Sequence, residues 1–342
     1  MILSICIPSY NRVEHLNNCL NSILIAKNNF PSFDFEVCVS DNNSEKDVKK
    51  IIQNYSDKFN LKFNQNKKNL GFANNAIKSV SMAEGKYSWL IGNDDLVTPD
   101  SFVCLNSILK NNLDKDYFYI NSYYMNSKYL ENFPKPFDTK NIVFENLDSI
   151  SKIKKDMSVN FWDVIDKEVS YDFLIGIFLS IFKTEKWLQQ VPKLDKKKID
   201  DTGVWSTFEN TCLNPILIAE SCKNSKAFVC SKPLSVNLFG EREWGDMYEF
   251  IEIVRIPEAL DYYRSKGLSF TKYIVNKNYA LRNFFIFFIK ILITGKKGGL
   301  AYVDFKKHFL YNLIYPNAWM SIIYFFCRKL RKIILSTIKI LI

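Results

Sequence analysis

The sequence predicts an α/β fold in which a mostly parallel sheet carries helices on both faces and is followed by a helical C-terminal region. Two observations predict the sheet: short apolar runs end in polar turns, and segments with apolar residues at helical spacing separate these runs. Such alternation, with short connections, is typical of parallel sheets. A third observation, helical periodicity from residue 246 onward, predicts the C-terminal region.

The elements of the first 92 residues follow this alternation in order. We expect strands at 2–7, within 35–44, at 61–64 and at 86–92, and helices over 13–24, 48–55 and 72–83. Polar loops follow three of these strands, at 8–12, 41–44 and 93–95. Ligands of open α/β sheets bind beyond the carboxyl ends of the strands, so these three loops are the expected binding site.

The rest of the chain is less regular. YFYINSYYMN, after residue 116, is expected to be a strand, 129–170 shows no clear pattern, and 171–245 mixes strand and helix signals. The apolar run at 284–293 is about half the ~20 residues that a membrane-spanning helix needs. Pro316 interrupts the next apolar stretch, so we expect no transmembrane helix.

The net charge of +10 is concentrated in the C-terminal region. Residues 280–342 hold eleven basic residues and one acid, whereas residues 1–279 are neutral overall. A broad nucleic-acid surface needs basic residues along its whole binding face, and the neutral body argues against such a partner. The tail is the part expected to contact an anionic surface.

The cysteines and histidines indicate the redox compartment and limit which metal sites and catalytic groups the chain can form. The 8 cysteines form no Cys-x-x-Cys pair and most lie in apolar runs, which fits a reducing compartment. The first apolar run stops at Pro8, too early for a signal peptide, so a cytoplasmic protein is expected. Because His15 and His308 are the only histidines, neither a histidine-rich zinc site nor a Ser-His-Asp triad is expected. Any metal must therefore be held by carboxylates.

Asp94 and Asp95 follow an apolar strand directly and precede an expected helix start at 98–100. Adjacent carboxylates repel each other, and a divalent cation such as Mg²⁺ or Mn²⁺, bound together with the oxygens of a diphosphate, would compensate. A solvated turn with a capping aspartate explains the same pair. Taken alone, the pair leaves both interpretations open.

The other two loops offer groups suited to a nucleotide. SYNR, residues 9–12, supplies an aromatic ring and a guanidinium for a base and its phosphates, or forms an ordinary strand-to-helix loop. Asp41 can accept a hydrogen bond from a base, or can cap a helix that starts near Ser44. Gly71 lets an anion approach the N-terminus of the helix that follows it.

Three segments in this order, SICIPSYNR, VCVSDNNS and NLGFANNAIKSVSMAEGKYSWLIGNDD, resemble the N-terminal half of family 2 glycosyltransferases, which have the GT-A fold. The resemblance covers residues 1–125 and implies a nucleotide-sugar donor, a divalent metal and inversion at the anomeric carbon. On this basis, we expect 1–125 to be the nucleotide-sugar-binding half of a GT-A domain and 126–245 its acceptor-side half. Residues 246–342 would be a helical, basic, membrane-associating region.

The resemblance also implies roles for individual residues. The nucleotide-sugar-binding set, which lies at the strand ends and in the loop before the third helix, comprises Pro8, Tyr10, Asn11, Arg12, Asp41, Asn43, Gly71 and Asn93. Asp94 matches the metal-binding carboxylate of the family's D-x-D region, with Asp95 beside it. Gly92 stands where the family often has Asp, so Asp94 and Asp95 must carry the metal largely alone. Asn74 stands where Arg is common in A-R-N, which leaves one diphosphate contact without a residue.

Inverting transfer needs a carboxylate that takes the proton from the attacking acceptor hydroxyl, and the family supplies it from the second half of the domain. Asp200 and Asp201, in KKKIDDTGVW before an expected helix, are the candidates. A solvated helix N-cap explains the same two residues. The competing carboxylates are Asp195, Glu209 and Glu241.

The sequence thus predicts a metal-dependent glycosyltransferase that moves a sugar from a nucleoside-diphosphate sugar to an acceptor hydroxyl. Its resemblance to bacterial enzymes with basic apolar tails implies a lipid-linked saccharide acceptor in O-antigen or capsule assembly. One alternative is a sugar-phosphate nucleotidyltransferase, although SICIPSYNR lacks the glycine-rich turn of that class. The other is a membrane-surface binding protein with a degenerate glycosyltransferase fold, which Gly92 favours.

The tail predicts the location of the protein. LRKIILSTIKILI, residues 330–342, can form a helix with one broad apolar face, which suits a membrane surface. Arg328, Lys329, Arg331 and Lys332 would attract anionic lipid. We expect the tail to hold the protein on the inner face of the plasma membrane; a helical packing or dimerisation surface is the alternative.

Overall fold

The computed structural model describes residues 1–240, 244–323 and 325–327. The chain divides into two compact units, Met1–Arg242 and Glu243–Ile342. The division of the first unit near residue 125 stays a prediction. Glu241, the predicted helix at 330–342 and the basic residues Arg328 and Lys329 lie outside the described residues.

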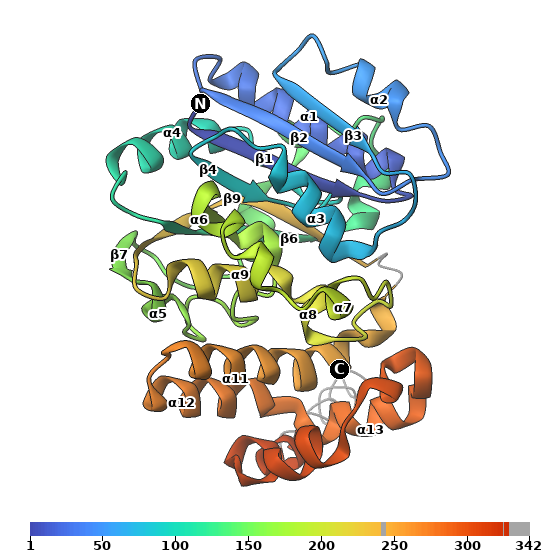
Figure 1. Ribbon diagram of the computed structural model, residues 1–342, viewed down its shortest axis with the longest axis vertical. Coiled ribbons are helices and arrows are strands. Elements are labelled where there is room, and N and C mark those ends of the chain that lie inside the picture. The colour runs from blue at the N-terminus through green and yellow to red at the C-terminus, as the bar shows by residue number, and fades with distance from the viewer. Residues whose placement is uncertain (241–243, 324, 328–342) are drawn as a thin grey trace, which may run out of the picture. The chain divides into compact units, whose positions relative to one another are not determined.

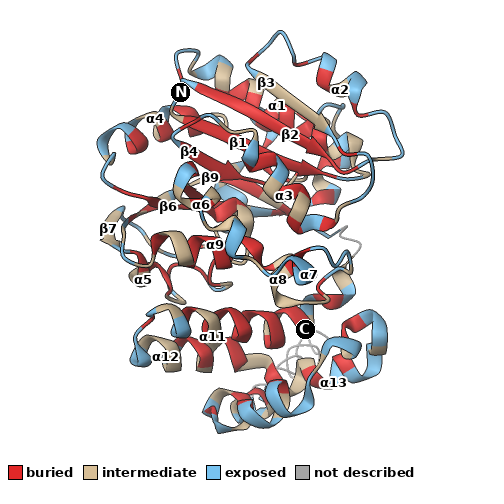
Figure 2. Cartoon of the chain, in the orientation of Figure 1, coloured by how far each residue is buried: buried red, intermediate tan, exposed pale blue. Residues whose placement is uncertain are grey.

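Within residues 1–240, nine strands form one mixed sheet in the order β3-β2-β1-β4-β8-β6-β9-β5, with β7 paired to β9 (Figure 1). The parallel strands of its first half are β1 (Leu3–Ser9), β2 (Phe35–Asp41), β3 (Leu61–Gln65) and β4 (Tyr87–Leu90). Figure 2 shows β1 and β2 buried along their length, as expected for apolar runs covered on both faces.

The order of these strands creates a switch point. The chain runs from β1 outward to β2 and β3, and then returns to place β4 on the other side of β1. Right-handed crossovers therefore put α1 (Val13–Asn29) and α3 (Gly71–Ser81) on opposite faces of the sheet. In open α/β sheets, ligands bind where the strand order reverses. Here that place lies between the carboxyl ends of β1 and β4.

The second half of the sheet is mixed. Its strands are β5 (Leu96–Val97), β6 (Tyr117–Asn126), β7 (Met157–Asn160), β8 (Ser180–Lys183) and β9 (Lys226–Phe239). β8 lies antiparallel between β4 and β6, and β9 runs parallel to β6 but antiparallel to β5 and β7. The other helices of the unit are α2 (Lys49–Gln53), α4 (Ser101–Asn111), α5 (Phe161–Val164), α6 (Thr184–Leu188), α7 (Lys196–Ile199), α8 (Phe208–Thr211) and α9 (Leu213–Cys222). The predicted α/β fold class is confirmed.

The expected helix at 48–55 is present as α2, which begins at Lys49, but no helix starts near Ser44, whose hydroxyl is bound to Asp41. The expected helix start just after Asp200 and Asp201 is wrong. Asp200 and Asp201 precede no helix directly: α7 ends before them, and α8 begins at Phe208 behind its own cap, Thr207. The two aspartates therefore lie in a loop between short helices.

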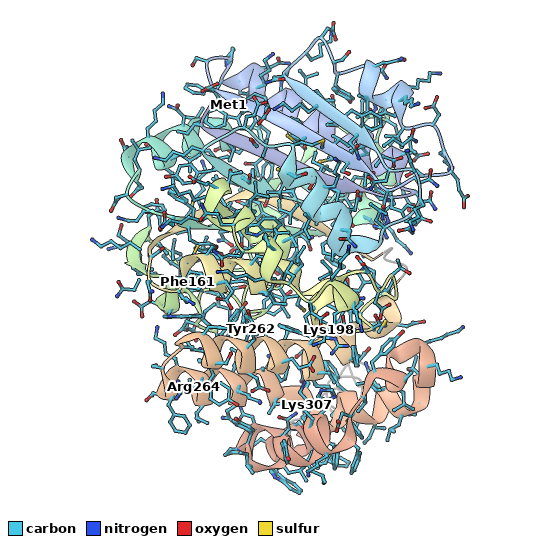
Figure 3. All side chains as sticks on the ribbon, in the orientation of Figure 1. Met1, Phe161, Lys198, Tyr262, Arg264 and Lys307 are labelled. Carbon is cyan, nitrogen blue, oxygen red and sulfur yellow. The ribbon has the colours of Figure 1, made fainter. Side chains whose placement is uncertain are left out.

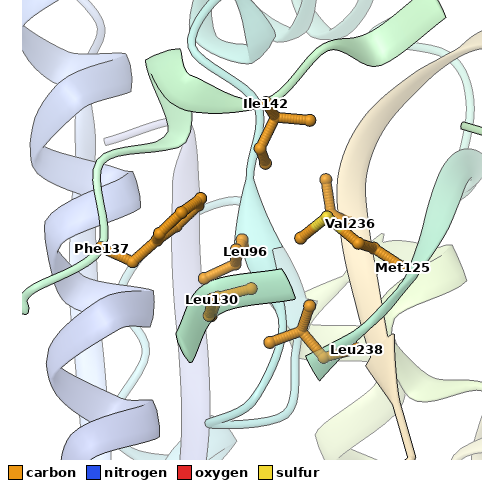
Figure 4. Packing of buried hydrophobic residues seen from close by; sticks show 7 residues of the cluster. All are labelled: Leu96, Met125, Leu130, Phe137, Ile142, Val236 and Leu238. Atoms are coloured by element: carbon orange, nitrogen blue, oxygen red, sulfur yellow. The ribbon is translucent and has the colours of Figure 1, made fainter. Parts of the chain in front are cut away.

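The segment 129–170, which has no clear sequence pattern, contributes to a small hydrophobic core beside the switch point. Seven buried residues of this core are shown in Figure 4: Leu96, Met125, Leu130, Phe137, Ile142, Val236 and Leu238. Leu96 directly follows the Asp94-Asp95 pair, and Val236 and Leu238 flank Asn237 in β9. Because side chains alternate along a strand, the packing of Val236 and Leu238 turns Asn237 toward the opposite face of β9.

The second unit is helical, as predicted. Its longer helices are α11 (Ile256–Lys266), α12 (Phe270–Ala280) and α13 (Phe284–Thr294), preceded by the short α10 (Tyr248–Phe250). Glu258, nearly buried in α11, binds Arg255, Lys307 and His308. Burial raises the pKa of Glu258, but these three neighbours outweigh burial and lower it to about 2. Across the described residues, we find no helix long and apolar enough to span a bilayer.

Candidate active site

Arg12 and Asp94 meet at the switch point. Nη1 of Arg12 donates to Oδ2 of Asp94 at 2.9 Å. The side chains are 20% and 15% exposed, so bulk solvent screens this ion pair less than a pair on the open surface. The two residues lie 82 positions apart in the sequence, and they come together because β4 pairs directly with β1.

Asp95 is turned into the protein. One carboxylate oxygen accepts the backbone N–H of Gly92 at 2.7 Å, and the other accepts Nδ2 of Asn237, also at 2.7 Å. These bonds close the turn after β4 and tie it to β9, and Asp95 is almost completely buried. Asp95 therefore shapes the turn that presents Asp94, a role that the sequence alone did not separate from metal binding.

A side chain at position 92 would meet the carboxylates of Asp94 and Asp95. A Cβ atom at this position would lie 2.6 Å from Oδ1 of Asp94 and 3.0 Å from Oδ2 of Asp95. The carboxylate of Asp94 thus occupies the space into which a side chain at position 92 would project. Any side chain at position 92 would require the carboxylate of Asp94 to turn away from its place.

Asp94 is the residue of this turn that fits a divalent cation. Mg²⁺ and Mn²⁺ are often bound by one or two carboxylates together with water and substrate phosphates, so a single carboxylate at a phosphate site is a sufficient protein ligand. Among the described residues, no group of three or more His, Cys, Asp or Glu side chains is arranged to hold a metal. The single carboxylate of Asp94 would suit a cation that is also bound by a diphosphate.

Asp41 lies fully buried at the end of β2 and holds the loop that follows. Its carboxylate accepts the backbone N–H of Ser44 at 3.1 Å, the Ser44 hydroxyl, and Nε2 of Gln65 at 3.2 Å. The helix-capping alternative for Asp41 is wrong because the loop, and not a helix, receives these bonds.

Asn11 links the loops that follow β1 and β2. Its backbone N–H donates to Oγ of Ser44 at 2.8 Å, and its side-chain oxygen accepts the backbone N–H of Glu45 at 2.9 Å. Asn11 and Asn43 have φ angles of 53° and 65°, a left-handed conformation that asparagine tolerates better than most residues. The left-handed backbone at these two predicted nucleotide-binding positions therefore favours asparagine.

Three asparagines that the sequence analysis missed fasten the strand ends together. Oδ1 of Asn75 accepts Oγ of Ser40 at 2.8 Å and Nδ2 of Asn66 at 3.0 Å, while its Nδ2 donates to the carbonyl of Ser9 at 3.2 Å. Asn66 also donates to Oδ1 of Asn42 at 3.1 Å. These bonds join β1, β2, β3 and α3 at one edge. In the sequence, Asn42 and Asn66 directly follow the ends of β2 and β3, whereas Asn75 lies within α3.

The remaining predicted nucleotide-binding residues lie along the same edge. Pro8 is buried in β1, and Asn93 donates from Nδ2 to Oγ of Ser9 at 3.0 Å. Tyr10 is 39% exposed, so part of this residue is accessible from solvent. Cys19 lies beneath the turn: burial, and then the charges of Asp95 and Asp94, raise the pKa of its thiol well above the usual range, which keeps it neutral.

The loop of Asp200 and Asp201 lies against the start of α3, although about 125 residues separate the two segments. Nδ2 of Asn74 donates to Oδ1 of Asp200 at 2.9 Å and to the carbonyl of Ile199 at 3.2 Å. Gly71, with a φ of 78°, sits so close that an added Cβ would lie 3.4 Å from Cα of Thr202. The structure thus brings the predicted base candidates to the nucleotide-binding half of the unit.

Within this loop, Asp201 is held by local bonds. Its carboxylate accepts the backbone N–H of Gly203 and the Ser206 hydroxyl, both at 2.8 Å, and the side chain stays exposed. The competing carboxylates have other partners: Asp195 accepts the backbone N–H of Lys197 as the cap of α7, and Glu209 pairs with Lys198, which Figure 3 labels.

Comparison with known proteins agrees with this geometry. Residues 4–145 match the family described as "Glycosyl transferase family 2". The abequosyltransferase RfbV of Salmonella typhimurium is 39% identical over 118 residues, which are 33% of this chain and 34% of RfbV. The poly(ribitol-phosphate) β-N-acetylglucosaminyltransferase TarS of Staphylococcus aureus is 31% identical over 102 residues, 30% of this chain and 18% of TarS.

These sequence matches span only about a third or less of either relative. The similarity in structure reaches further: the crystal structure of S. aureus TarS 1–349 aligns with a TM-score of 0.54 and 17% identity, covering 82% of this chain and 71% of that one. At this identity the likeness concerns the fold. Residues 4–145 are thus similar to glycosyl transferase family 2, and the fold around them is that of the GT-A enzyme TarS.

Proposed function

We propose that this protein is an inverting glycosyltransferase that moves a sugar from a nucleoside-diphosphate sugar to an acceptor hydroxyl. The observation that carries the proposal is the meeting of two regions distant in sequence. The Asp200–Asp201 loop lies against Gly71 and Asn74, at the same strand-end edge on which Asp41 and Asp94 are held. A donor and a base can therefore be presented at one edge of the sheet.

The residues of this edge would divide the binding of the donor. Tyr10 offers its exposed ring to the base, while Asp41, Asn11 and Asn43 shape the loops around the nucleoside. Arg12 would contact the diphosphate, since a guanidinium can donate two parallel hydrogen bonds to phosphate oxygens. When bound at Asp94, Mg²⁺ or Mn²⁺ would supply positive charge that stabilises the departing diphosphate.

Asp201 or Asp200 would act as the general base. Inversion in one displacement requires that a carboxylate remove the proton of the acceptor hydroxyl as that hydroxyl attacks. Both carboxylates are exposed, so an acceptor can approach them. Asp200 is anchored to Asn74, whereas Asp201 is bound by Gly203 and Ser206 of its own loop.

The names of two relatives support the substrate class that we propose. RfbV is named for transfer of abequose, and TarS for transfer of N-acetylglucosamine to poly(ribitol phosphate); crystals of TarS contain UDP or UDP-GlcNAc. Chondroitin synthase of Escherichia coli also matches, at 32% identity over 112 residues. We propose a lipid-linked saccharide acceptor in the assembly of a bacterial surface polysaccharide such as O-antigen or capsule.

A transfer assay tests this function. The purified chain is incubated with Mn²⁺, a panel of nucleoside-diphosphate sugars and lipid-linked saccharides extracted from bacteria, and the nucleoside diphosphate released is measured. We expect acceptor-dependent release from one donor, and NMR of the product should show an inverted anomeric centre. If every donor is inert although one of them binds, the alternative of a degenerate, non-catalytic fold is correct.

We further propose that the second unit attaches the protein to the inner face of the plasma membrane. Ile289, Leu292 and Ile293 are exposed along one side of α13, whereas Phe284 and Phe288 of the same helix are buried. Exposed Lys296, Lys297 and Lys306 follow this face in sequence, and such lysines would attract anionic headgroups. Apolar residues flanked by lysines on an exposed surface are typical of proteins that bind anionic membranes.

Vesicle sedimentation tests the membrane proposal. The full chain should sediment with phosphatidylglycerol vesicles at low salt, and the double variant Ile289→Glu, Ile293→Glu should not. Deletion of residues 309–342 tests the contribution of the tail and should also release the protein while sparing transfer to a water-soluble acceptor. A full chain that ignores anionic vesicles at low salt would make the membrane proposal wrong.

A further inference from the structure

Arg12 has no close substitute at the switch point. It is the only arginine among residues 1–241. Position 74, at the start of α3, holds an asparagine that donates to Asp200 and to the carbonyl of Ile199, so it supplies no guanidinium. Lys67 and Lys68 follow β3, three strand positions and about 14 Å from β4. The guanidinium nearest to Asp94 is therefore the group best placed to meet a diphosphate there.

Asp94 is already paired with a positive group. Its Oδ2 accepts the hydrogen bond from Arg12, while its Oδ1 lies beside Gly92. A divalent cation would have to bind a carboxylate whose charge the guanidinium already neutralises. Two positive groups on one carboxylate repel each other unless further negative charge is added. The diphosphate of a donor supplies that charge.

We infer that Arg12 and the cation compete for Asp94, so that the cation binds tightly only after a donor diphosphate has drawn Arg12 away. This inference rests on the proposed function, because it takes Asp94 as the cation ligand. Arg12 is then a positioning residue with two partners: it holds Asp94 in the empty site and contacts phosphate in the loaded one. Binding of cation and nucleotide is coupled, and the coupling is equal in both directions.

The experiment measures Mn²⁺ binding without any activity. The full chain and its variants are titrated with Mn²⁺ alone, and free Mn²⁺ is followed by electron paramagnetic resonance. Arg12→Met removes the guanidinium, Arg12→Lys keeps a charge there, and Asp94→Ala removes the ligand. Lys58→Met is the matched control, because it removes one positive charge from an exposed pair with Asp57, near the opposite end of the strands.

We expect Arg12→Met to bind Mn²⁺ about fivefold tighter than wild type, the effect of releasing an ion pair at the upper end of the range for exposed pairs. Arg12→Lys should bind like wild type or only slightly tighter, and Lys58→Met should not change the affinity. Addition of UDP or GDP should tighten Mn²⁺ binding in wild type, and by a smaller factor in Arg12→Met. Melting temperatures check that each variant is folded.

Two results would overturn the inference, and only the second would also overturn the cation site of the proposed function. If Arg12→Met binds Mn²⁺ no tighter than wild type while Asp94→Ala loses binding, the competition is absent but the cation site stands. If Asp94→Ala binds Mn²⁺ as well as wild type, the cation site of the proposed function is wrong, and the competition fails with it.

Discussion

The two sides of the candidate site are built differently. On the donor side, the ends of β1, β2 and β3 are joined by hydrogen bonds among buried groups, including Asp41 and Asn75. On the acceptor side, Asp200 and Asp201 are exposed in a loop between two short helices, held mainly by bonds within that loop and by Asn74. Under the proposed function, this difference predicts that the donor side is shaped before binding, whereas the form of the acceptor loop depends on few contacts.

The largest effect is expected on the acceptor side. Asp201→Asn or Asp200→Asn, whichever removes the base, should lower kcat by about 100-fold or more, since general bases typically contribute 10²–10⁴-fold. Donor affinity should stay unchanged, because these carboxylates do not belong to the strand-end network. Steady-state kinetics and donor titrations measure the two effects.

Asp195→Asn serves as the control for this pair, because its carboxylate caps α7. It should keep near wild-type kcat. If both Asp200→Asn and Asp201→Asn also keep wild-type kcat, neither residue is the base, and Glu209 becomes the next candidate.

Asp41→Ala tests the donor side. If the carboxylate meets the base, nucleotide binding should weaken by roughly 1–3 kcal/mol, the usual cost of leaving a buried partner unsatisfied. Calorimetric titration with the nucleoside diphosphate measures this change, and Asp57→Ala, at an exposed position, is the control. An unchanged affinity together with a lower free energy of unfolding would restrict Asp41 to the structural bonds with Ser44 and Gln65.

Asn75→Ala should affect stability more than chemistry. It removes bonds to Ser9, Ser40 and Asn66 in a buried place, and we expect the free energy of unfolding to fall by about 1–3 kcal/mol. Denaturant unfolding measures the loss. A variant as stable as wild type would show that the asparagine network does not stabilise the donor side.

The smallest effect is expected from Asn74→Ala, at the position next to Asn75. This variant frees Asp200 from α3. Because one partly exposed hydrogen bond contributes about 1 kcal/mol, we expect kcat to fall roughly fivefold. Donor affinity should not change. If the variant instead binds the donor more weakly and keeps its kcat, Asn74 belongs to the donor side. Asn74 and Asn75 would then not serve different sides of the site.

The same contrast explains what could be predicted from the sequence. The strand ends carrying Asp41 and Asp94 were predictable because a parallel sheet brings consecutive strand ends to one edge. The roles of Asp94 and Asp95 were not, since only the packing of β9 turns Asn237 toward Asp95. The contact between Asn74 and Asp200 joins residues 126 positions apart, which no local pattern encodes. The asparagine network was missed because asparagine is common in ordinary turns.

The most direct test of the account is whether Asp94 makes cation and nucleotide binding interdependent. The melting temperature of the wild-type chain is measured with Mn²⁺, with UDP or GDP, and with Mn²⁺ and nucleotide together, and the series is repeated with Asp94→Ala. We predict a rise for one nucleotide with Mn²⁺ that exceeds the sum of the separate rises, and loss of this excess in a folded Asp94→Ala protein. An excess rise that survives in Asp94→Ala would contradict the central claim.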